Sequence, residues 1–195
     1  RKRLQAVEEE QREQTKKRNK LLYQSEHDEL TGLYNKRSLN RYLEDVFEAC
    51  KLNEKELGIL FLDIDYFKQL NDRYGHGKGD EGICAVADTL KRIFPEDYVA
   101  RYGGDEFLVV MTGRDLTYVM EHAESLCAGI RECKIPNEDS EVESWLTISV
   151  GGVCAIPKEP NRVWDFLSAA DNTLYEQKKE QKGKVRFYQG EGKYL

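Results

Sequence analysis

The sequence has little of what would mark a membrane-embedded, zinc-binding or disulfide-stabilised protein. It contains no apolar run long enough to span a bilayer and no signal peptide. Its five cysteines and three histidines are scattered, and none stands at the spacing of a metal-ligand pair. Scattered cysteines of this kind are typical of reduced residues in the cytoplasm. We therefore expect a cytoplasmic location and no structural zinc.

An excess of positive charge is also missing. The formal net charge is −6 over 195 residues, whereas a protein that binds long nucleic acids needs a basic surface. Nucleic acid is therefore not an expected partner, although an acidic protein can still bind nucleotides at a local site. Hydrophobic residues make up 39% of the chain and charged residues 34%, which is typical of a globular domain with a substantial core.

Glycine and proline are absent from the first 26 residues, which are polar and favour helix. Two interpretations of this segment stay open: a helix that pairs two protomers and transmits an upstream rearrangement, and a solvated helix that frays. We assign residues 1–27 to a helical, coiled-coil-like stalk and residues 28–195 to one globular domain. A heptad seam with a polar middle can be drawn through Leu4, Val7, Gln11, Gln14, Arg18 and Leu21.

The rest of the chain alternates between strand and helix patterns. The apolar run at 57–64 is typical of a strand buried on both faces, and Gly151-Gly152 inside a later strand suggests a bulge or a close approach. Residues 75–79, with three glycines, are expected to form a flexible loop. This order favours an α/β (α+β) fold, with a mixed central sheet flanked by helices. Helices are expected at 36–52, 66–74, 80–93, 116–133 and 163–182, and strands at 57–65, 97–100, 107–111, 145–156 and 185–188.

Three carboxylates stand where a buried strand or a tight hairpin is expected to end. Asp63 lies near the end of the apolar run, where an unpaired carboxylate beside a core is costly. Asp105 and Glu106 follow two glycines at a hairpin tip, and they point to opposite faces because successive strand residues alternate. If the two strands are neighbours, Asp63 and Asp105 would face each other and hold a divalent cation, which prefers carboxylate oxygens.

Four ordered motifs resemble the GGDEF domain, the catalytic domain of diguanylate cyclases. They are residues 28–35 (DELTGLYN), 63–68 (DIDYFK) with Asn71-Asp72, 75–80 (GHGKGD) and 101–107 (RYGGDEF). The resemblance extends from about residue 28 to the C-terminus. It implies a fold like that of nucleotidyl cyclase and polymerase palm domains. It also implies that two GTP molecules are condensed into cyclic di-GMP and two pyrophosphates.

The same resemblance implies partners and cofactors. Members of the family act as homodimers in which each protomer presents one GTP, and they use two Mg²⁺ ions, or Mn²⁺, per active site. Because the chain begins at Arg1 and not at a Met, we expect an upstream sensor domain to be missing from it. Such a sensor could lie in a membrane, with this part of the protein on the cytoplasmic side.

The resemblance assigns roles to individual residues. Asp63 and Asp105 would bind metal, with the Ile64 carbonyl as a further ligand, and Glu106 would either complete the metal site or help to activate the 3′-hydroxyl. The residues implied in substrate binding are Phe67, Lys68, Asn71, Asp80, Gly103, Gly104, Lys178 and Lys182.

Simpler interpretations remain for some of these positions. Asp80 could be the N-cap of its helix, and the two glycines of the hairpin could form a plain tight turn. Asp65 and His76 are interpreted as structural residues. Asp80 as a carboxylate favours GTP over mixed GTP and ATP use, because guanine offers the N1–H and N2–H donors that adenine lacks.

Two departures from the family pattern bear on function. The second basic residue at the phosphates is normally an arginine, but here it is Lys182 by count or Lys184 by its neighbouring glycine, and lysine lacks the bidentate fork. The Arg-x-x-Asp motif of product inhibition reads Phe94-Pro95-Glu96-Asp97, so the arginine is missing and Asp97 is retained. We expect no inhibitory site. The altered basic tail keeps an alternative open, a degenerate module that binds nucleotide or a partner protein without turnover.

Overall fold

The computed structural model describes residues 2–189 of the chain, and the side chains of residues 9–189. Within this range one mixed six-stranded sheet has the strand order β1-β3-β4-β2-β5-β6. β4 and β5 flank β2 and run antiparallel to it, whereas the pairs β1–β3 and β5–β6 are parallel. The strands are β1 (Tyr34–Asn35), β2 (Leu57–Ile64), β3 (Tyr98–Arg101), β4 (Glu106–Thr112), β5 (Ile148–Ala155) and β6 (Val185–Phe187).

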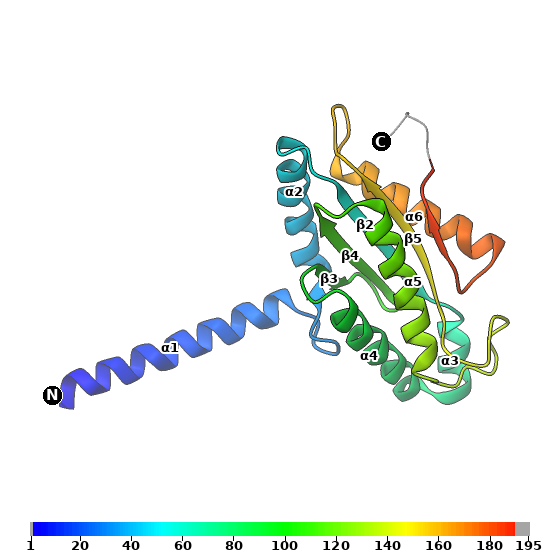
Figure 1. The fold of residues 1–195 in the computed structure, drawn as a ribbon. Helices are drawn as coiled ribbons and strands as arrows, with labels where there is room; N and C mark the ends of the chain where they lie inside the picture. The colour runs from blue at the N-terminus through cyan, green and yellow to red at the C-terminus, as the bar shows by residue number, and fades with distance from the viewer. Residues whose placement is uncertain (1, 190–195) are drawn as a thin grey trace.

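Helices cover both faces of the sheet and make three layers (Figure 1). α2 (Lys36–Leu52) and α6 (Val163–Glu180) pack on one face. α4 (His76–Ile93) and α5 (Leu116–Glu132) pack on the other, and α3 (Phe67–Tyr74) lies beside α4. The expected mixed sheet flanked by helices is therefore confirmed.

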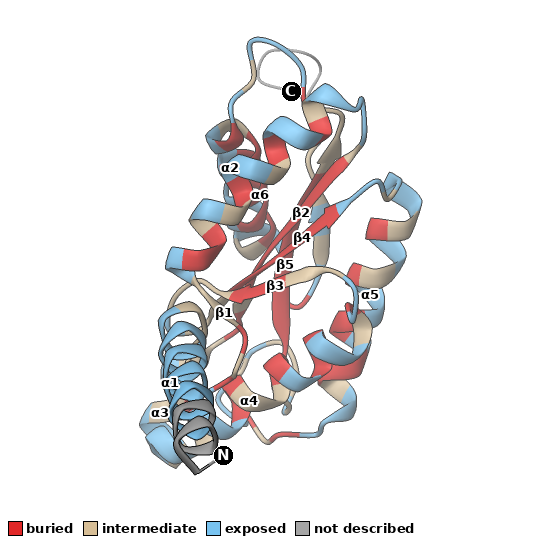
Figure 2. Cartoon of the chain, turned by 90° about the vertical axis from the view of Figure 1, so that its left-hand side faces the viewer, coloured by how far each residue is buried: buried red, intermediate tan, exposed pale blue. Residues whose placement is uncertain are grey.

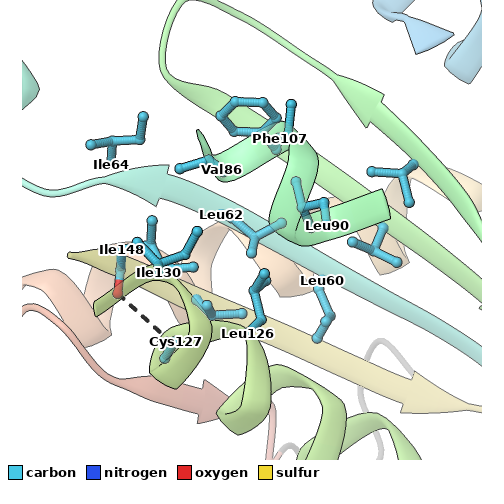
Figure 3. Packing of buried hydrophobic residues seen from close by; sticks show 14 of the residues in the cluster. Leu60, Leu62, Ile64, Val86, Leu90, Phe107, Leu126, Cys127, Ile130 and Ile148 are labelled. Atoms are coloured by element: carbon cyan, nitrogen blue, oxygen red, sulfur yellow. Dashed lines mark hydrogen bonds between the residues drawn. The ribbon is translucent and has the colours of Figure 1, made fainter. Parts of the chain in front are cut away.

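β2 forms the centre of the core because both of its faces are apolar. Leu60, Leu62 and Ile64 pack under α4 and α5, as Figure 3 shows, while Ile59 and Phe61 face α2 and α6. Figure 2 shows the buried strands running through the middle of the domain. Residues on one face alternate with those on the other, so Asp63, two residues after Phe61, belongs to the α2–α6 face.

The glycine-rich stretch at 75–79 is not the flexible loop that was expected. α4 already begins at His76, after a break at Gly75 with φ of 85°. Gly79 lies inside the helix, where a Cβ would come 2.0 Å from Oδ1 of Asn71, so the glycine allows close packing of α3 on α4. Asp80 stands in the second turn of α4, and the interpretation as an N-cap is wrong.

The two glycines of β5 lie in a strand without a bulge, since β5 pairs residue by residue with β2 from Ile148 to Ala155. The other expected feature, a close approach of neighbouring atoms to the two glycines, is present. A Cβ on Gly151 would lie 2.2 Å from the backbone nitrogen of Leu174 in α6, and a Cβ on Gly152 would lie 2.5 Å from the ring of Phe187. Glycine here lets α6 lie directly on the sheet.

α1 (Lys2–Glu26) is a single exposed helix that projects from the domain (Figures 1 and 2). Leu21 and Leu22 near its end are 58% and 52% exposed. Of the seam expected on this helix, the side chains of Leu4 and Val7 lie outside the described residues. None of the helices in the described part of the chain is both long and apolar enough to cross a membrane.

A column of five stacked aromatic rings connects the end of α1 to the sheet. Tyr23 in α1 stacks on His27, and His27 stacks on Tyr34 of β1. Tyr34 stacks on Tyr98 of β3, which in turn stacks on Tyr42 of α2. Successive ring centroids are 3.9–4.5 Å apart, which is within the range of favourable aromatic pairs.

Candidate active site

The carboxylates singled out in the sequence meet where β2 ends beside the β3–β4 hairpin. The strand register places Asp63 directly opposite Glu106. Asp105 precedes the strand, and its carbonyl accepts a hydrogen bond of 3.2 Å from the backbone N–H of Ile64. The register therefore makes Glu106 the cross-strand neighbour of Asp63, while Asp105, just before the strand, lies close enough for its charge to act on Asp63 as well. That Asp63 and Asp105 hold a metal ion together stays a prediction.

Lys178 of α6 reaches across to this carboxylate pair. Its Nζ lies 2.7 Å from Oδ1 of Asp63, and the Asp63 side chain is only 15% exposed. Burial raises the pKa of Asp63 from 3.8 to about 6, although the bond from Lys178 lowers it, and the nearby Asp105 and Asp65 raise it again. Burial and the charge of Asp105 likewise raise the pKa of Glu106. The site therefore holds more negative charge than one lysine neutralises.

These carboxylates fit a divalent cation whose remaining ligands are substrate phosphates and water. In the described residues no three His, Cys, Asp or Glu side chains form a group that could hold a metal ion unaided. Mg²⁺ does not need such a cage, because it usually takes one or two carboxylates together with substrate phosphates and water. Asp63, Glu106 and Asp105, with the Ile64 carbonyl, are the oxygens at hand. Repulsion among the carboxylates would be relieved by a cation.

Arg101 holds the hairpin in shape. Its Nε donates to the carbonyls of Gly103 and Gly104, both at 3.1 Å, and its Nη1 pairs with Oδ1 of Asp28 at 3.1 Å. The sequence showed Arg101 as part of a motif, but its contacts, which join the hairpin to Asp28 at the start of the globular domain, were not predicted. Arg101 and Asp28 are 73 residues apart, so no local pattern in the sequence indicates that they pair.

The two glycines of the hairpin differ in their surroundings. A Cβ on Gly103 would lie 2.6 Å from Oε2 of Glu106, so a side chain there would displace this carboxylate. Nothing lies within 4 Å of a Cβ on Gly104, which faces open space. Gly103 is therefore explained by the packing of the site itself, while Gly104 leaves room above the hairpin lip for a ligand.

Asn71 and Asp80 lie on the packed pair α3 and α4. Oδ1 of Asn71 is buried and has no hydrogen-bond partner among the described residues, although a buried polar atom normally has one. Gly79 packs against this same oxygen, and the next residue, Asp80, is exposed on α4. An unpaired acceptor beside an exposed carboxylate suits a ligand with several N–H donors.

The lysines expected to bind the phosphates are Lys178 and either Lys182 or Lys184. Lys178 bonds to Asp63, as described above. Nζ of Lys182 lies 3.9 Å from the centre of the Tyr66 ring, just after the end of β2. The carbonyl of Lys184 accepts a bond from Val150 in the adjacent strand. Of the two alternatives, Lys182 thus lies beside the turn that follows Asp65, in which Phe67 packs against the core and Lys68 is exposed.

Asp65 is completely buried beside the carboxylate pair. Thr147 donates to its Oδ2 at 2.8 Å and Ser149 to its Oδ1 at 2.6 Å. Its interpretation as a structural residue agrees with this environment. Ser149 and Thr147 carried no signal in the sequence, because they are more than 80 residues from Asp65.

The position where an inhibitory arginine is missing lies inside the core. Phe94 is 1% exposed and packs in the cluster under α4 and α5. Burial raises the pKa of Asp97, while the positive charge of Arg114 lowers it. An apolar side chain facing inward offers nothing to an anionic ligand at this position.

Comparisons with known proteins agree with the geometry. The family model described as "Diguanylate cyclase, GGDEF domain" matches residues 25–184. The probable diguanylate cyclase DgcC of Escherichia coli K12 is 32% identical over 163 residues, which are 83% of this chain and 43% of DgcC. An uncharacterized signaling protein of Caulobacter vibrioides is 30% identical over 182 residues, or 92% of this chain and 22% of that protein. The chain thus spans less than half the length of either relative.

Solved structures show the same architecture. The coiled coil and GGDEF domain of DgcB from Caulobacter crescentus, in complex with c-di-GMP, superposes with a TM-score of 0.85 at 24% identity, covering 95% of this chain and 97% of that one. The diguanylate cyclase SiaD of Pseudomonas aeruginosa, in complex with its activator SiaC, gives 0.73 at 27% identity, with 95% and 72% covered. The likeness to DgcB shows the fold. With the family match over most of its length, the chain belongs to the GGDEF domain family of diguanylate cyclases.

Proposed function

We propose that this chain condenses two GTP molecules into cyclic di-GMP and two pyrophosphates, acting as a homodimer. The observation that carries the proposal is the cross-strand pair of Asp63 and Glu106, with Lys178 of α6 bonded to Asp63. Partly buried carboxylates that repel one another beside a lysine suit a metal–triphosphate, which brings both positive and negative charge. The structural neighbour DgcB was solved in complex with c-di-GMP, and the sequence relative DgcC is named a probable diguanylate cyclase.

Each residue has a role in this reaction. Asp63, Asp105 and the Ile64 carbonyl would hold Mg²⁺ or Mn²⁺, two ions per site, and Glu106 would complete the metal site or take the proton of the 3′-hydroxyl. Bound metal supplies neutralisation of phosphate charge and a lower pKa for the attacking hydroxyl. Lys178, which pairs with Asp63 in the structure, would hold the triphosphate together with Lys182, Phe67 and Lys68. The open space above Gly104 receives the nucleotide.

Guanine recognition falls to Asn71 and Asp80. Asn71 and the exposed carboxylate of Asp80 lie on adjoining helices, and a carboxylate can accept hydrogen bonds from N1–H and N2–H of guanine. Adenine would leave these acceptors unsatisfied, and a site built to hydrogen-bond rejects an analogue that lacks the donors. GTP is therefore the substrate we propose, in preference to mixed GTP and ATP use.

A homodimer is required by the stereochemistry of the product. Each 3′-hydroxyl attacks the α-phosphate of the other GTP, so two nucleotides must lie in opposite orientation, and a single chain presents one carboxylate site. Two copies facing each other would satisfy this, and positioning alone supplies much of the rate enhancement. The exposed α1 is the element through which an upstream sensor would set the pairing.

The first experiment is product analysis after incubation with GTP and Mg²⁺ over a range of protein concentrations. We expect cyclic di-GMP, with a rate per protomer that rises with concentration. Asp63→Asn should lower the rate at least about a hundredfold, because a bound metal lowers the barrier by several kcal/mol. Asp88→Asn is the matched control, since Asp88 is an exposed carboxylate on α4 that pairs with Lys91 at the surface.

A degenerate module that binds nucleotide without turnover is the alternative, and one observation favours it. The basic tail offers lysines where the family has lysine and arginine, and Lys178 is already engaged by Asp63. If GTP binds but no product forms, even with Mn²⁺ and at concentrations where sedimentation shows a dimer, the alternative replaces the proposed function.

A further inference from the structure

A chain of hydrogen bonds beside the carboxylate site leads from Asp65 to the backbone of the basic tail. By basic tail we mean residues 178–184, which contain the lysines expected to bind phosphate. Ser149 of β5 bonds to Oδ1 of Asp65 at 2.6 Å, and the same hydroxyl lies 3.1 Å from the backbone nitrogen of Gly183. Asp65 and Ser149 are both fully buried. The connection joins residues that are 84 and 34 positions apart in the sequence.

The direction of these bonds follows from their chemistry. The N–H of Gly183 can only donate, so the Ser149 oxygen accepts from it. The single hydroxyl proton of Ser149 then remains for Asp65, which accepts it. Without Ser149, the N–H of Gly183 would be a buried donor with no partner in this arrangement, a costly situation for any backbone group.

Gly183 is also held from its other sides. Its carbonyl accepts a 2.5 Å bond from Nη2 of Arg131, and Nε of Arg131 pairs with Glu143 at 2.8 Å. Its φ of 75° favours glycine, and a Cβ would come 2.7 Å from Cγ1 of Val142. One peptide of the tail is therefore fixed in position and direction, between Lys182 on one side and the β6 strand on the other.

Asp65 connects this tail to the turn that follows β2. Tyr66 comes directly after Asp65 and is the N-cap of α3, in a left-handed conformation with φ of 54°. Its ring carries the ammonium group of Lys182. The turn and the tail, the two segments that would hold the phosphates, thus meet over one buried carboxylate.

We propose that Ser149 is a positioning residue for the phosphate-binding lysines. The relay from Asp65 through Ser149 to Gly183 sets the tail so that Lys182 stands against Tyr66, and the turn and the tail meet the triphosphate as one unit. The inference rests on the proposed function for its ligand, the polyphosphate of a nucleotide. Contacts to phosphates that do not react are made equally before and during the reaction, so their loss raises KM and leaves kcat almost unchanged.

Thr147 provides a matched control. It gives Asp65 a hydroxyl bond of nearly the same length, 2.8 Å, and it is equally buried at 1% exposed. The structure gives its hydroxyl no bond to the tail. Ser149→Ala and Thr147→Val therefore remove the same kind of bond from Asp65, but only Ser149→Ala removes the partner of Gly183.

The test uses the full 195-residue chain, with two measurements for each variant. Hydrogen–deuterium exchange at the Gly183 amide reports the relay. Calorimetric binding of 3′-deoxy-GTP with Mg²⁺ reports the site, because this nucleotide lacks the attacking hydroxyl and is not consumed. Ser149→Ala should speed exchange at Gly183 and weaken binding about five- to tenfold, the range of one hydrogen bond. Thr147→Val should change binding less than about twofold.

The outcomes separate the inference from the function on which it rests. Equal weakening in both variants would show only a structural role for these hydroxyls and would overturn the inference. Faster exchange at Gly183 without weaker binding would overturn it as well. If the unmodified chain itself binds no 3′-deoxy-GTP, the proposed function fails first and the inference fails with it. A raised KM for GTP with unchanged kcat in Ser149→Ala would support both.

Discussion

Replacing Gly151 by alanine should be one of the most damaging single-methyl changes in this domain. The added Cβ would lie 2.2 Å from the nitrogen of Leu174 and 2.3 Å from the carbonyl oxygen of Ala170. Both distances are more than about 1 Å shorter than ordinary contact, and both atoms are helix backbone that no rotamer change can move. α6 as a whole would have to retreat from β5.

The expected cost follows from overpacking. Inserting a methyl group into a well-packed core costs about 1–3 kcal/mol when side chains can adjust, so a rigid backbone neighbour places Gly151→Ala at about 3 kcal/mol or more. Domains of this kind have about 5–15 kcal/mol of stability, so the variant should still fold. Because α6 carries Lys178, activity should also fall.

Urea unfolding followed by circular dichroism measures the effect. Gly77→Ala is the control, because Gly77 lies in α4 and nothing is within 4 Å of the added Cβ. There alanine should stabilise the protein by about 0.5–1 kcal/mol, through better helix propensity. If Gly151→Ala and the control differ by less than about 1 kcal/mol, then the domain tolerates a shift of α6 and the packing argument is wrong.

Three further predictions follow from the site and its supports. Burial raises the pKa of Asp28, but the hydrogen bonds from Thr31 and the pair with Arg101 hold it below the ordinary 3.8. The stability it contributes is therefore present above pH 3.8 and lost as the pH falls through its lower folded value. The urea midpoint of Asp28→Asn should vary less between pH 6 and pH 3 than that of the unmodified protein, and parallel curves would contradict this. Cyclic di-GMP should not inhibit turnover, because Phe94 is buried where the family has arginine, whereas inhibition at low micromolar levels would refute the expectation. EDTA should abolish turnover without changing the melting temperature by more than a few degrees, since apolar side chains on both faces of the sheet make the core, and excess Mg²⁺ should restore turnover.

The sequence predicted the mixed sheet and the order of its elements, apart from the short β1 (Tyr34–Asn35), because their signals are local. The apolar run of β2 and the helical period of α2 and α5 depend only on neighbouring residues. The glycines at 75–79 were misinterpreted because composition favours a loop there, while the structure uses Gly79 to let Asn71 pack against a helix. Tertiary contact overrode local propensity in that segment.

The sequence singled out the residues of the candidate site, whose roles stay predictions, but it did not give their geometry. Motif spacing identified Asp63, Asp105 and Glu106, yet the register that places Glu106 opposite Asp63 depends on how the hairpin closes, and an error of one residue changes the face of every side chain. The connection of Ser149 with Gly183 could not have been predicted, because neither residue is ionisable and nothing local shows that they meet.

The column of five aromatic rings has a mechanical consequence for α1. Stacked rings resist being pushed together, since repulsion rises steeply below contact distance, but sliding one ring over another costs little. We expect a tilt of α1 toward the domain to be passed through His27 and Tyr34 to Tyr98, whereas a shift of α1 across the ring faces is absorbed. Fusing a leucine zipper to α1 in successive registers would test this, and Tyr98→Leu should make activity insensitive to register. β3 carries Tyr98 near one end and Arg101 at the other, so a push on the column arrives at the residue that grips the hairpin. A tilt of α1 toward the domain would then move the hairpin that carries Asp105 and Glu106, whereas a shift of α1 across the ring faces would leave the hairpin in place.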